Sequence, residues 1–221
     1  MKDTILLIDL PVYPKGVISL SLLSVAECLA DDYEVIIADL NISPLTKILN
    51  SVNPVIMCGL KVSAQNFKQA QEVTLILRKK FHETKIVWGG ELPTLLPNVC
   101  LQYADTIVGG LFEPVSSTFV EDLKSRNLSR KYYGPNNVDI ISYPDLRRLP
   151  NRDAYYSFMG LPLETSRGCT EHCIFCMVHT MQKKDYHLSD LTLLKNHLKQ
   201  YKNAFINVID YNFGVNSNHV I

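Results

Sequence analysis

"TILLIDL", residues 4–10, is a continuous apolar run that contains β-branched side chains. Such a run is typical of a parallel strand covered on both faces, because a strand with one wet face alternates apolar and polar residues. A helical pattern follows in "SLSLLSVAECLA", residues 19–30, and a second strand pattern in "YEVIIADL", residues 33–40. Strand, helix and strand in this order predict a parallel sheet with crossover helices.

The same alternation continues to residue 126. Ser43 and Pro44 favour a helix start, with the Ser43 hydroxyl as N-cap and Pro44 at the first helical position. We expect strands at 54–60, 85–90 and 105–110, and helices at 45–52, 64–81 and 115–126. The predicted fold class is therefore α/β, with a right-handed, doubly wound, Rossmann-like parallel sheet.

Ligands of such sheets bind beyond the carboxyl ends of the strands. Ser63, in the segment after the third strand, and the pair Gly89 and Gly90, after the fourth, are therefore candidate cofactor-binding residues. Paired glycines permit positive φ and close approach of a ligand to the backbone, although they suit tight turns equally well. The sequence has neither G-x-G-x-x-G nor a P-loop motif, so an ordinary dinucleotide or P-loop site is not indicated.

The pattern breaks after residue 126 in a Tyr-rich stretch with several prolines and glycines, which we interpret as a linker. Periodicity resumes as a strand, a loop, a helix and a strand, which is the opening of a second βα array. The first strand is expected at 161–166, the helix at 188–201 and the second strand at 204–210. The predicted division of the chain is 1–126, 127–160 and 161–221.

Three cysteines gather in the loop "SRGCTEHCIFCMV". Cys169, Cys173 and Cys176 have the spacing C-x-x-x-C-x-x-C. Structural zinc takes four ligands, so three thiolates are one short. A 4Fe–4S cluster held by three thiolates instead leaves one iron open to a substrate or cofactor.

Other interpretations of this loop stay open on spacing alone. Zinc is one, with His179 or His172 as the fourth ligand. A redox C-x-x-C pair of Cys173 and Cys176 is another, and three unliganded core cysteines are a third. Cys28, Cys58 and Cys100 are scattered singly in apolar surroundings, where a cysteine is usually a small buried hydrophobe.

Composition narrows the classes of partner. Lys plus Arg equals Asp plus Glu at 22 each, without a run of like charge, so we expect neither nucleic acid nor an anionic membrane as partner. No stretch approaches the roughly 20 apolar residues of a membrane span, and the first apolar run is too short for a signal peptide. We expect a cytoplasmic protein with reduced thiols whose partners are small molecules or proteins.

"TSRGCTEHCIFC" resembles the cluster-binding motif of radical S-adenosylmethionine (radical SAM) enzymes in order, spacing, the aromatic Phe175 and the leading "SRG". In that family the motif follows the first strand of a partial (β/α) barrel. The upstream region resembles the cobalamin (B12)-binding-type domain that precedes the barrel in one branch of the family. The corresponding stretches, in the same order, are "LLIDLPVYPKGVISLSLLS", "VWGGELPTLLPN", "ADTIVGGLFEP" and "LRRLPNRDAYYS".

The resemblance implies a 4Fe–4S cluster on Cys169, Cys173 and Cys176, with S-adenosylmethionine (SAM) chelating the fourth iron. The reduced cluster would cleave SAM to a 5′-deoxyadenosyl radical. Phe175 would pack near the cluster or the adenine, and Asp210, in "VIDYNF", would face the SAM amino group, although it also suits a strand-end turn. The implied partners are a small-molecule or peptide substrate and an electron donor such as flavodoxin or ferredoxin.

Two departures from the family pattern matter. The motif D-x-H-x-x-G, which supplies histidine to cobalt, is missing, and Glu91 stands where histidine often follows the paired glycines. Branch members without that motif include proteins that bind cobalamin and proteins that do not. The sequence therefore leaves open whether this chain binds cobalamin. After Cys176 the chain has room for one helix, one strand and a tail, whereas each βα unit of a barrel takes on the order of 30 residues. We therefore expect a chain truncated within the barrel, or one that a partner completes.

The sequence thus favours a radical SAM enzyme fragment that performs methyl transfer or another radical rearrangement, with little activity by itself. The competing hypothesis is a non-catalytic Rossmann-like binding module whose cysteine loop carries zinc or a vestigial cluster. The intact motif favours the enzyme, and the missing barrel strands favour the binding module.

Overall fold

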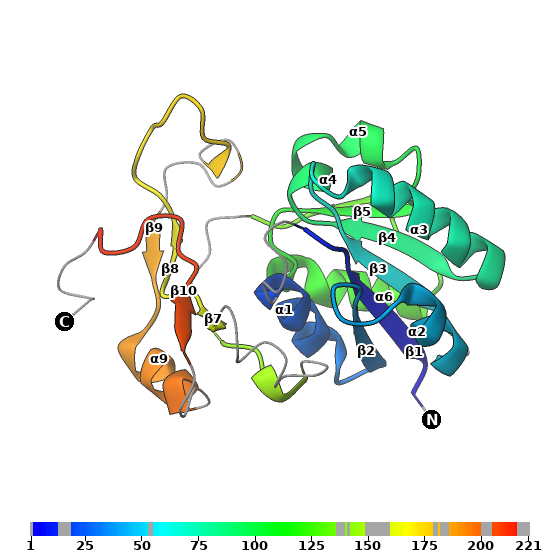
Figure 1. The fold of residues 1–221 in the computed structure, drawn as a ribbon, viewed down its shortest axis with the longest axis horizontal. Helices are drawn as coiled ribbons and strands as arrows, with labels where there is room; N and C mark the ends of the chain where they lie inside the picture. The colour runs from blue at the N-terminus through cyan, green and yellow to red at the C-terminus, as the bar shows by residue number, and fades with distance from the viewer. Residues whose placement is uncertain are drawn as a thin grey trace.

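A six-stranded parallel sheet forms the first part of the chain (Figure 1), in the strand order β2-β1-β3-β4-β5-β6. The structure is a computed structural model that describes residues 2–12, 19–52, 55–135, 140, 142–148, 160–178, 181, 186–199 and 205–215. The strands are β1 (Thr4–Asp9), β2 (Glu34–Asp39), β3 (Met57–Lys61), β4 (Lys85–Gly89), β5 (Thr106–Gly109) and β6 (Lys131–Tyr133). The order reverses between β1 and β3, which makes their carboxyl ends the topological switch point of the sheet.

Helices cover both faces of this sheet. One face carries α1 (Leu20–Leu29) and α6 (Ser116–Lys124). The other carries α2 (Leu45–Ser51), α3 (Phe67–Lys80), α4 (Glu91–Leu95) and α5 (Pro97–Cys100). In β1, Leu6 and Ile8 pack under α2 and α3, whereas Ile5 and Leu7 pack under α1 and α6. This two-sided burial explains the continuous apolar run of the first strand and confirms the predicted sheet.

Trp88 anchors α3 to the centre of the sheet. Its indole Nε1 donates a hydrogen bond of 3.0 Å to the Thr74 hydroxyl of α3. Its ring stacks on Tyr103, with centroids 5.6 Å apart and planes 8° from parallel. Because Trp88 is fully buried and is the single tryptophan of the chain, its fluorescence reports the unfolding of this sheet.

Several local expectations were wrong. Lys131–Tyr133, within the predicted linker, form the edge strand β6, and the short helices α4 and α5 follow β4 where no helix was predicted. Pro44 rather than Ser43 occupies the cap position of α2. The amide of Ser43 donates to the Asp39 carbonyl, so this residue belongs to the turn after β2. The helix expected at 64–81 begins only at Phe67, because Asn66 ties the preceding loop.

The second module contains two small sheets and a helix. Strands β7 (Leu161–Leu163) and β10 (Ile206–Val208) are parallel, as predicted for a second βα array. The strand expected at 161–166 ends early, and a separate strand β8 (Ser166–Gly168) pairs antiparallel with β9 (Tyr186–Leu188). Helix α9 (Leu191–Leu198) is capped by Asp190, whose Oδ1 accepts from the amides of Thr192 and Leu193 at 2.9 Å.

An apolar cluster joins this module to α1. Leu20 and Leu23 of α1 share a buried core with Leu161 and Leu163 of β7 and with Leu146 of the short 3₁₀ helix η2 (Leu146–Arg148). Among the described residues, no helix is both long and apolar enough to cross a membrane.

His197 of α9 lies at the edge of this cluster. Its ring stacks on Tyr143, with centroids 4.2 Å apart and planes 8° from parallel. Burial lowers the pKa of His197 from 6.5 to about 4. As pH falls, this imidazole therefore takes up its proton in the unfolded chain near pH 6.5, but in the folded chain only near pH 4.

The second module should therefore lose stability as pH falls from about 6.5 toward 4, because protons then favour the unfolded state. We expect His197→Phe, which keeps an aromatic ring against Tyr143, to remove about 1–2 kcal/mol of the pH dependence between pH 7.5 and pH 5. Urea unfolding followed by circular dichroism at both pH values measures this difference. Equal pH dependence in variant and wild type would show that His197 is not buried in its neutral form.

Candidate functional site

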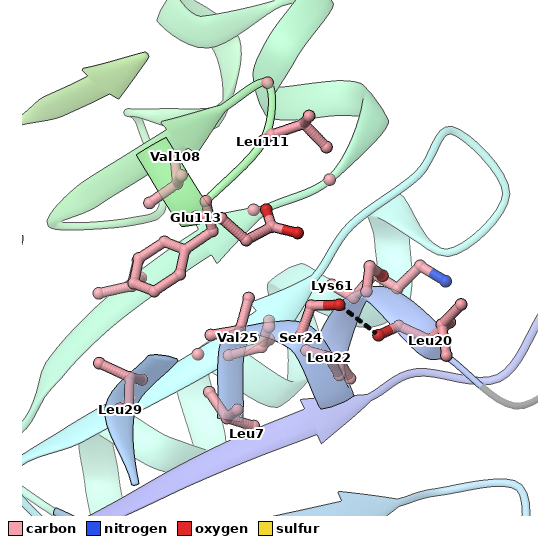
Figure 2. Close-up of a pocket in the computed structure, with 18 of the residues that line it drawn as sticks. Leu7, Leu20, Leu22, Ser24, Val25, Leu29, Lys61, Val108, Leu111 and Glu113 are labelled. Atoms are coloured by element: carbon pink, nitrogen blue, oxygen red, sulfur yellow. Dashed lines mark hydrogen bonds between the residues drawn. The ribbon is translucent and has the colours of Figure 1, made fainter. Parts of the chain in front are cut away.

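A cavity of about 390 Å³ opens at the carboxyl ends of β3, β4 and β5, on the face covered by α1. In Figure 2, Leu22 and Val25 of α1 lie opposite Val108 of β5 and Glu113 across this cavity. The lining is mostly apolar, and Lys61 contributes a charged group at the end of β3. The cavity occupies the edge at which ligands of parallel sheets bind.

The paired glycines lie in the wall of this cavity, but only one of them has to be a glycine. Gly90 has a φ of +107°, and a Cβ there would stand 2.9 Å from the Val62 carbonyl oxygen. Gly89 has no such conformation, and the nearest atom to an added Cβ would be 3.8 Å away. The backbone of both residues is therefore open to a ligand, and Gly90 also makes the turn into α4.

Ser63 lies in the loop after β3 and is not among the residues that line the cavity. Its amide donates to Asn66 Oδ1 at 2.8 Å, and Asn66 Nδ2 donates to the Lys61 carbonyl at 3.2 Å. The Ser63 hydroxyl oxygen is buried and has no hydrogen-bond partner among the described residues. A buried hydroxyl without a partner costs free energy, so it is available to a polar group of a ligand.

The second module closes the cavity from the opposite side, through Glu164, Ser166, Arg167, Ile209 and Tyr211. Arg167 is only 8% exposed. Its Nη2 lies 3.1 Å from Glu113 Oε1, and its Nε lies 3.0 Å from Glu164 Oε2. Burial raises the pKa of Glu164, and the guanidinium of Arg167 opposes that rise. A charged network thus forms part of an otherwise apolar wall.

The cysteine loop begins directly after Arg167 and Gly168, at the end of β8. Cys173 is exposed, Cys169 and Cys176 are half-buried, and all three thiols are free. The Glu171 amide donates to Cys169 Sγ at 3.4 Å, and the Cys176 amide donates to the Cys173 carbonyl at 3.0 Å. The loop is therefore folded locally around its cysteines.

The described residues do not contain three or more His, Cys, Asp or Glu side chains arranged to hold a metal ion. The structure thus carries the three thiols on one loop without converging them. Their chemistry nevertheless fits an iron–sulfur cluster, because soft thiolates outside the core are the ligands that such clusters take. His172 is exposed on the same loop, and His179 lies outside the described residues.

The remaining predicted SAM contacts, Phe175 and Asp210, are not among the residues that line the cavity. Phe175 is 89% exposed. Asp210 accepts three hydrogen bonds, from the Thr165 amide at 2.6 Å, the Thr165 hydroxyl at 2.5 Å and the Ser166 hydroxyl at 2.7 Å. Both of its carboxylate oxygens therefore fasten the end of β10 to the segment between β7 and β8. A contact from Phe175 or Asp210 to SAM stays a prediction.

Sequence reasoning missed most of the cavity wall. Tyr211, the neighbour of Asp210, lines the cavity with Ile209, because alternate residues of an extended segment face opposite sides. Glu113 and Arg167 are 54 residues apart in the chain, and no local pattern connects them. The "SRG" that precedes the cysteines was the one sequence signal that included Arg167.

The other cysteines are not candidates for ligation. Cys58 and Cys100 are fully buried, which confirms their interpretation as core residues. Burial raises the pKa of their thiols to about 12 and about 11. Cys28 is half-buried, and burial raises its pKa as well. Thiolate chemistry in this chain therefore belongs to the exposed loop.

Asp9 is a buried acid at the carboxyl end of β1. It is 6% exposed and in register with Lys61 of β3 and Asp39 of β2. Burial raises its pKa to about 7, Lys61 lowers it and Asp39 raises it further. The folded chain therefore keeps the Asp9 proton at pH values at which the unfolded chain, with a pKa of 3.8, has lost it.

No family model matches the chain. A curated relative is the bacteriochlorophyllide d C-8(2)-methyltransferase of Chlorobaculum tepidum. It is 23% identical over 154 residues, which are 67% of this chain and 34% of that protein.

Solved structures with the same fold include TsrM of Kitasatospora setae, a radical SAM methyltransferase. Its structure with cobalamin and a [4Fe-4S] cluster matches with a TM-score of 0.82 and 16% identity, over 99% of this chain and 51% of that one. Its structure with tryptophan substrate and the SAM analogue aza-SAM matches with a TM-score of 0.77 and 15% identity, over 99% and 49%.

The chain thus spans about half of TsrM and about a third of the curated relative. At these identities the likeness establishes the fold.

Removing the Asp210 carboxylate should destabilise the second module. Asp210→Ala leaves three donors of the buried residues Thr165 and Ser166 without an acceptor, at a cost of about 2–3 kcal/mol. Urea unfolding followed by circular dichroism measures this loss, while Trp88 fluorescence should report an unchanged sheet. Asp145→Ala, which removes an acid paired with the exposed Arg147, is the control and should leave the midpoint near the wild-type value. Equal effects of the two variants would show that the hydrogen bonds of Asp210 do not stabilise the second module.

Asp9→Asn should stabilise the sheet at pH 8, because the folded wild-type chain then holds a buried ionised carboxylate, at a free-energy cost that accumulates as pH rises from about 4 to about 7. We expect a gain of roughly 2 kcal/mol at pH 8 that disappears near pH 4, where the folded chain already holds the proton. Denaturant unfolding followed by Trp88 fluorescence at both pH values measures the gain. A gain that is independent of pH would contradict the raised pKa of Asp9.

The same α/β architecture in TsrM and in this chain gives the structural conclusion: the chain has a Rossmann-like, B12-binding-type parallel-sheet domain, followed by the start of a partial (β/α) barrel.

Proposed function

We propose that this chain is the cofactor-binding portion of a radical SAM methyltransferase. Cys169, Cys173 and Cys176 hold a 4Fe–4S cluster, SAM binds the iron that they leave open, and cobalamin occupies the carboxyl edge of the sheet. The observation that carries this proposal is the position of the cysteine loop, which starts two residues after Arg167 in the wall of the 390 Å³ cavity. The proposed metal ligands thus follow the cavity wall directly along the chain.

Two similar proteins support the proposed cofactors and reaction type. TsrM, which has the same fold, is a radical SAM methyltransferase whose structure holds cobalamin and a [4Fe-4S] cluster. The curated relative is a methyltransferase as well. We therefore propose methyl transfer ahead of other radical rearrangements, on a small-molecule or peptide substrate, with flavodoxin or ferredoxin as electron donor.

The residues of the loop suit an oxygen-sensitive cluster. Three free thiols supply one ligand fewer than the cluster has irons, which leaves a position for SAM. When bound, the reduced cluster supplies the electron that cleaves SAM to methionine and a 5′-deoxyadenosyl radical. Ile174 and Phe175 are exposed between Cys173 and Cys176, so these apolar side chains are available to pack against a bound cluster or ligand.

The residues at the carboxyl edge suit a large, mostly apolar ligand with polar groups on its rim. The backbones of Gly89 and Gly90 line the cavity, whereas Ser63, whose buried hydroxyl has no partner among the described residues, does not line it. The described part of the edge offers no histidine, so cobalamin would bind here without a histidine ligand to cobalt. The role of these residues is to hold and orient the ligand against the second module.

The domain division 1–126, 127–160 and 161–221 remains our proposal. Strand β6 returns from the linker segment to the edge of the sheet before the chain enters the second module. The exposed apolar residues after β10, such as Phe213 and Val215, lie where we propose that further barrel strands pack.

Anaerobic reconstitution with iron and sulfide tests the proposal. The wild-type chain should take up iron and sulfide, acquire a broad visible absorbance and, after reduction, give an electron paramagnetic resonance (EPR) signal that SAM changes. A variant with Ala at Cys169, Cys173 and Cys176 should bind no cluster. Cys28→Ala, which removes a half-buried thiol outside the loop, is the matched control and should behave as wild type.

Stoichiometric zinc with no iron in the wild-type chain would overturn the proposal in favour of the non-catalytic module. An EPR signal that SAM leaves unchanged would also overturn it, because the open iron would then have no SAM site. Absorbance titration with hydroxocobalamin tests the cobalamin site separately, and an unchanged spectrum would remove that cofactor from the proposal.

A further inference from the structure

The cysteine loop is held by a very short piece of secondary structure. It connects β8 with β9, whose ladder has three residue pairs, from Ser166 with Leu188 to Gly168 with Tyr186. A two-stranded ladder of this length is marginally stable in water by itself. The position of the loop therefore depends on the contacts that anchor β8 to the rest of the molecule.

Arg167, the central residue of β8, makes the anchoring contact with the sheet domain. Its guanidinium bridges Glu164, three residues earlier, and Glu113, which begins the 3₁₀ helix η1 (Glu113–Val115) after β5. The Glu113 and Glu164 side chains are only 21% and 23% exposed. An arginine is suited to this bridge because its planar fork donates from two edges at once, which a lysine ammonium does not match.

The described structure contains a second ion pair between these parts of the chain, and it differs in burial. Arg148 Nε lies 2.9 Å from Glu27 Oε2 of α1, but the two side chains are 38% and 43% exposed. Exposed pairs contribute little because water and salt screen them. The Arg167 network is far less screened, and removing one partner leaves a buried charge uncompensated.

We propose that Arg167 is a positioning residue, which holds the cysteine loop against the carboxyl edge of the sheet through Glu113 and Glu164. This role depends on the proposed function in one respect, which is that the cysteine loop binds the cluster. The ion pair with Glu113 links the cavity wall of one domain to the strand that precedes the cysteine loop of the other. The register of that strand then fixes where the thiolates stand relative to the cavity.

Hydrogen–deuterium exchange tests this role in the cluster-free chain. Glu113→Gln and Arg167→Lys should each raise the exchange rates of the β8 and β9 amides about tenfold, because the ladder then opens more often. Glu27→Gln, which removes the exposed pair, is the matched control and should change these rates less than twofold. Unchanged Trp88 fluorescence verifies that the sheet domain is folded in every variant.

The readout that separates positioning from stability is a distance. A nitroxide on Lys68→Cys, an exposed site of α3, and the reduced cluster form a pair for pulsed EPR. The distance distribution should be narrow in the otherwise wild-type chain, broad in Glu113→Gln and narrow again in Glu27→Gln.

Exchange rates and distance distributions in Glu113→Gln that equal those of Glu27→Gln would overturn the positioning role. Failure of the wild-type chain to assemble a cluster would instead overturn the proposed function, and the exchange experiment would still decide the role of Arg167.

Discussion

Arg167 is buried between two carboxylates that belong to different parts of the chain, and the arrangement of the molecule around its cavity depends on this network. Removing a guanidinium from water is costly unless hydrogen-bonded carboxylates compensate it, so burial of Arg167 requires both partners. The apolar cluster of α1 and β7 also holds the second module, but apolar contacts have no preferred direction. The two directional bonds of Arg167 supply the orientation that the apolar cluster lacks.

The sheet could be predicted because its strands are buried on two faces and therefore appear as uninterrupted apolar runs. The same physics explains what was missed. β6 is a three-residue edge strand with exposed Lys131 and Tyr133, which is too short and too polar for such a run. The helices α4 and α5 are four or five residues long and contain Pro93 and Pro97, so their sequence favours a loop.

The candidate site also has one part that the sequence predicted and one part that it did not. The three loop cysteines could be proposed as metal ligands because they lie on one loop, where spacing alone gives the signal. The cavity wall was not found, since it joins Glu113 to Arg167 over a long stretch of chain. Asp210 and Tyr211 are neighbours that face opposite sides of an extended segment, so Tyr211 lines the cavity while Asp210 bonds Thr165 and Ser166, and no sequence pattern distinguishes the two faces.

The central claim is that the three thiols hold a cluster whose open iron is a SAM site. Mössbauer spectroscopy of the chain reconstituted with ⁵⁷Fe tests it most directly, because the spectrum resolves the iron sites of a cluster individually. The account predicts that SAM changes the parameters of one iron of the 4Fe–4S cluster and leaves the other three as they were. Four irons that do not respond to SAM, or a chain that retains zinc and no iron, would contradict it.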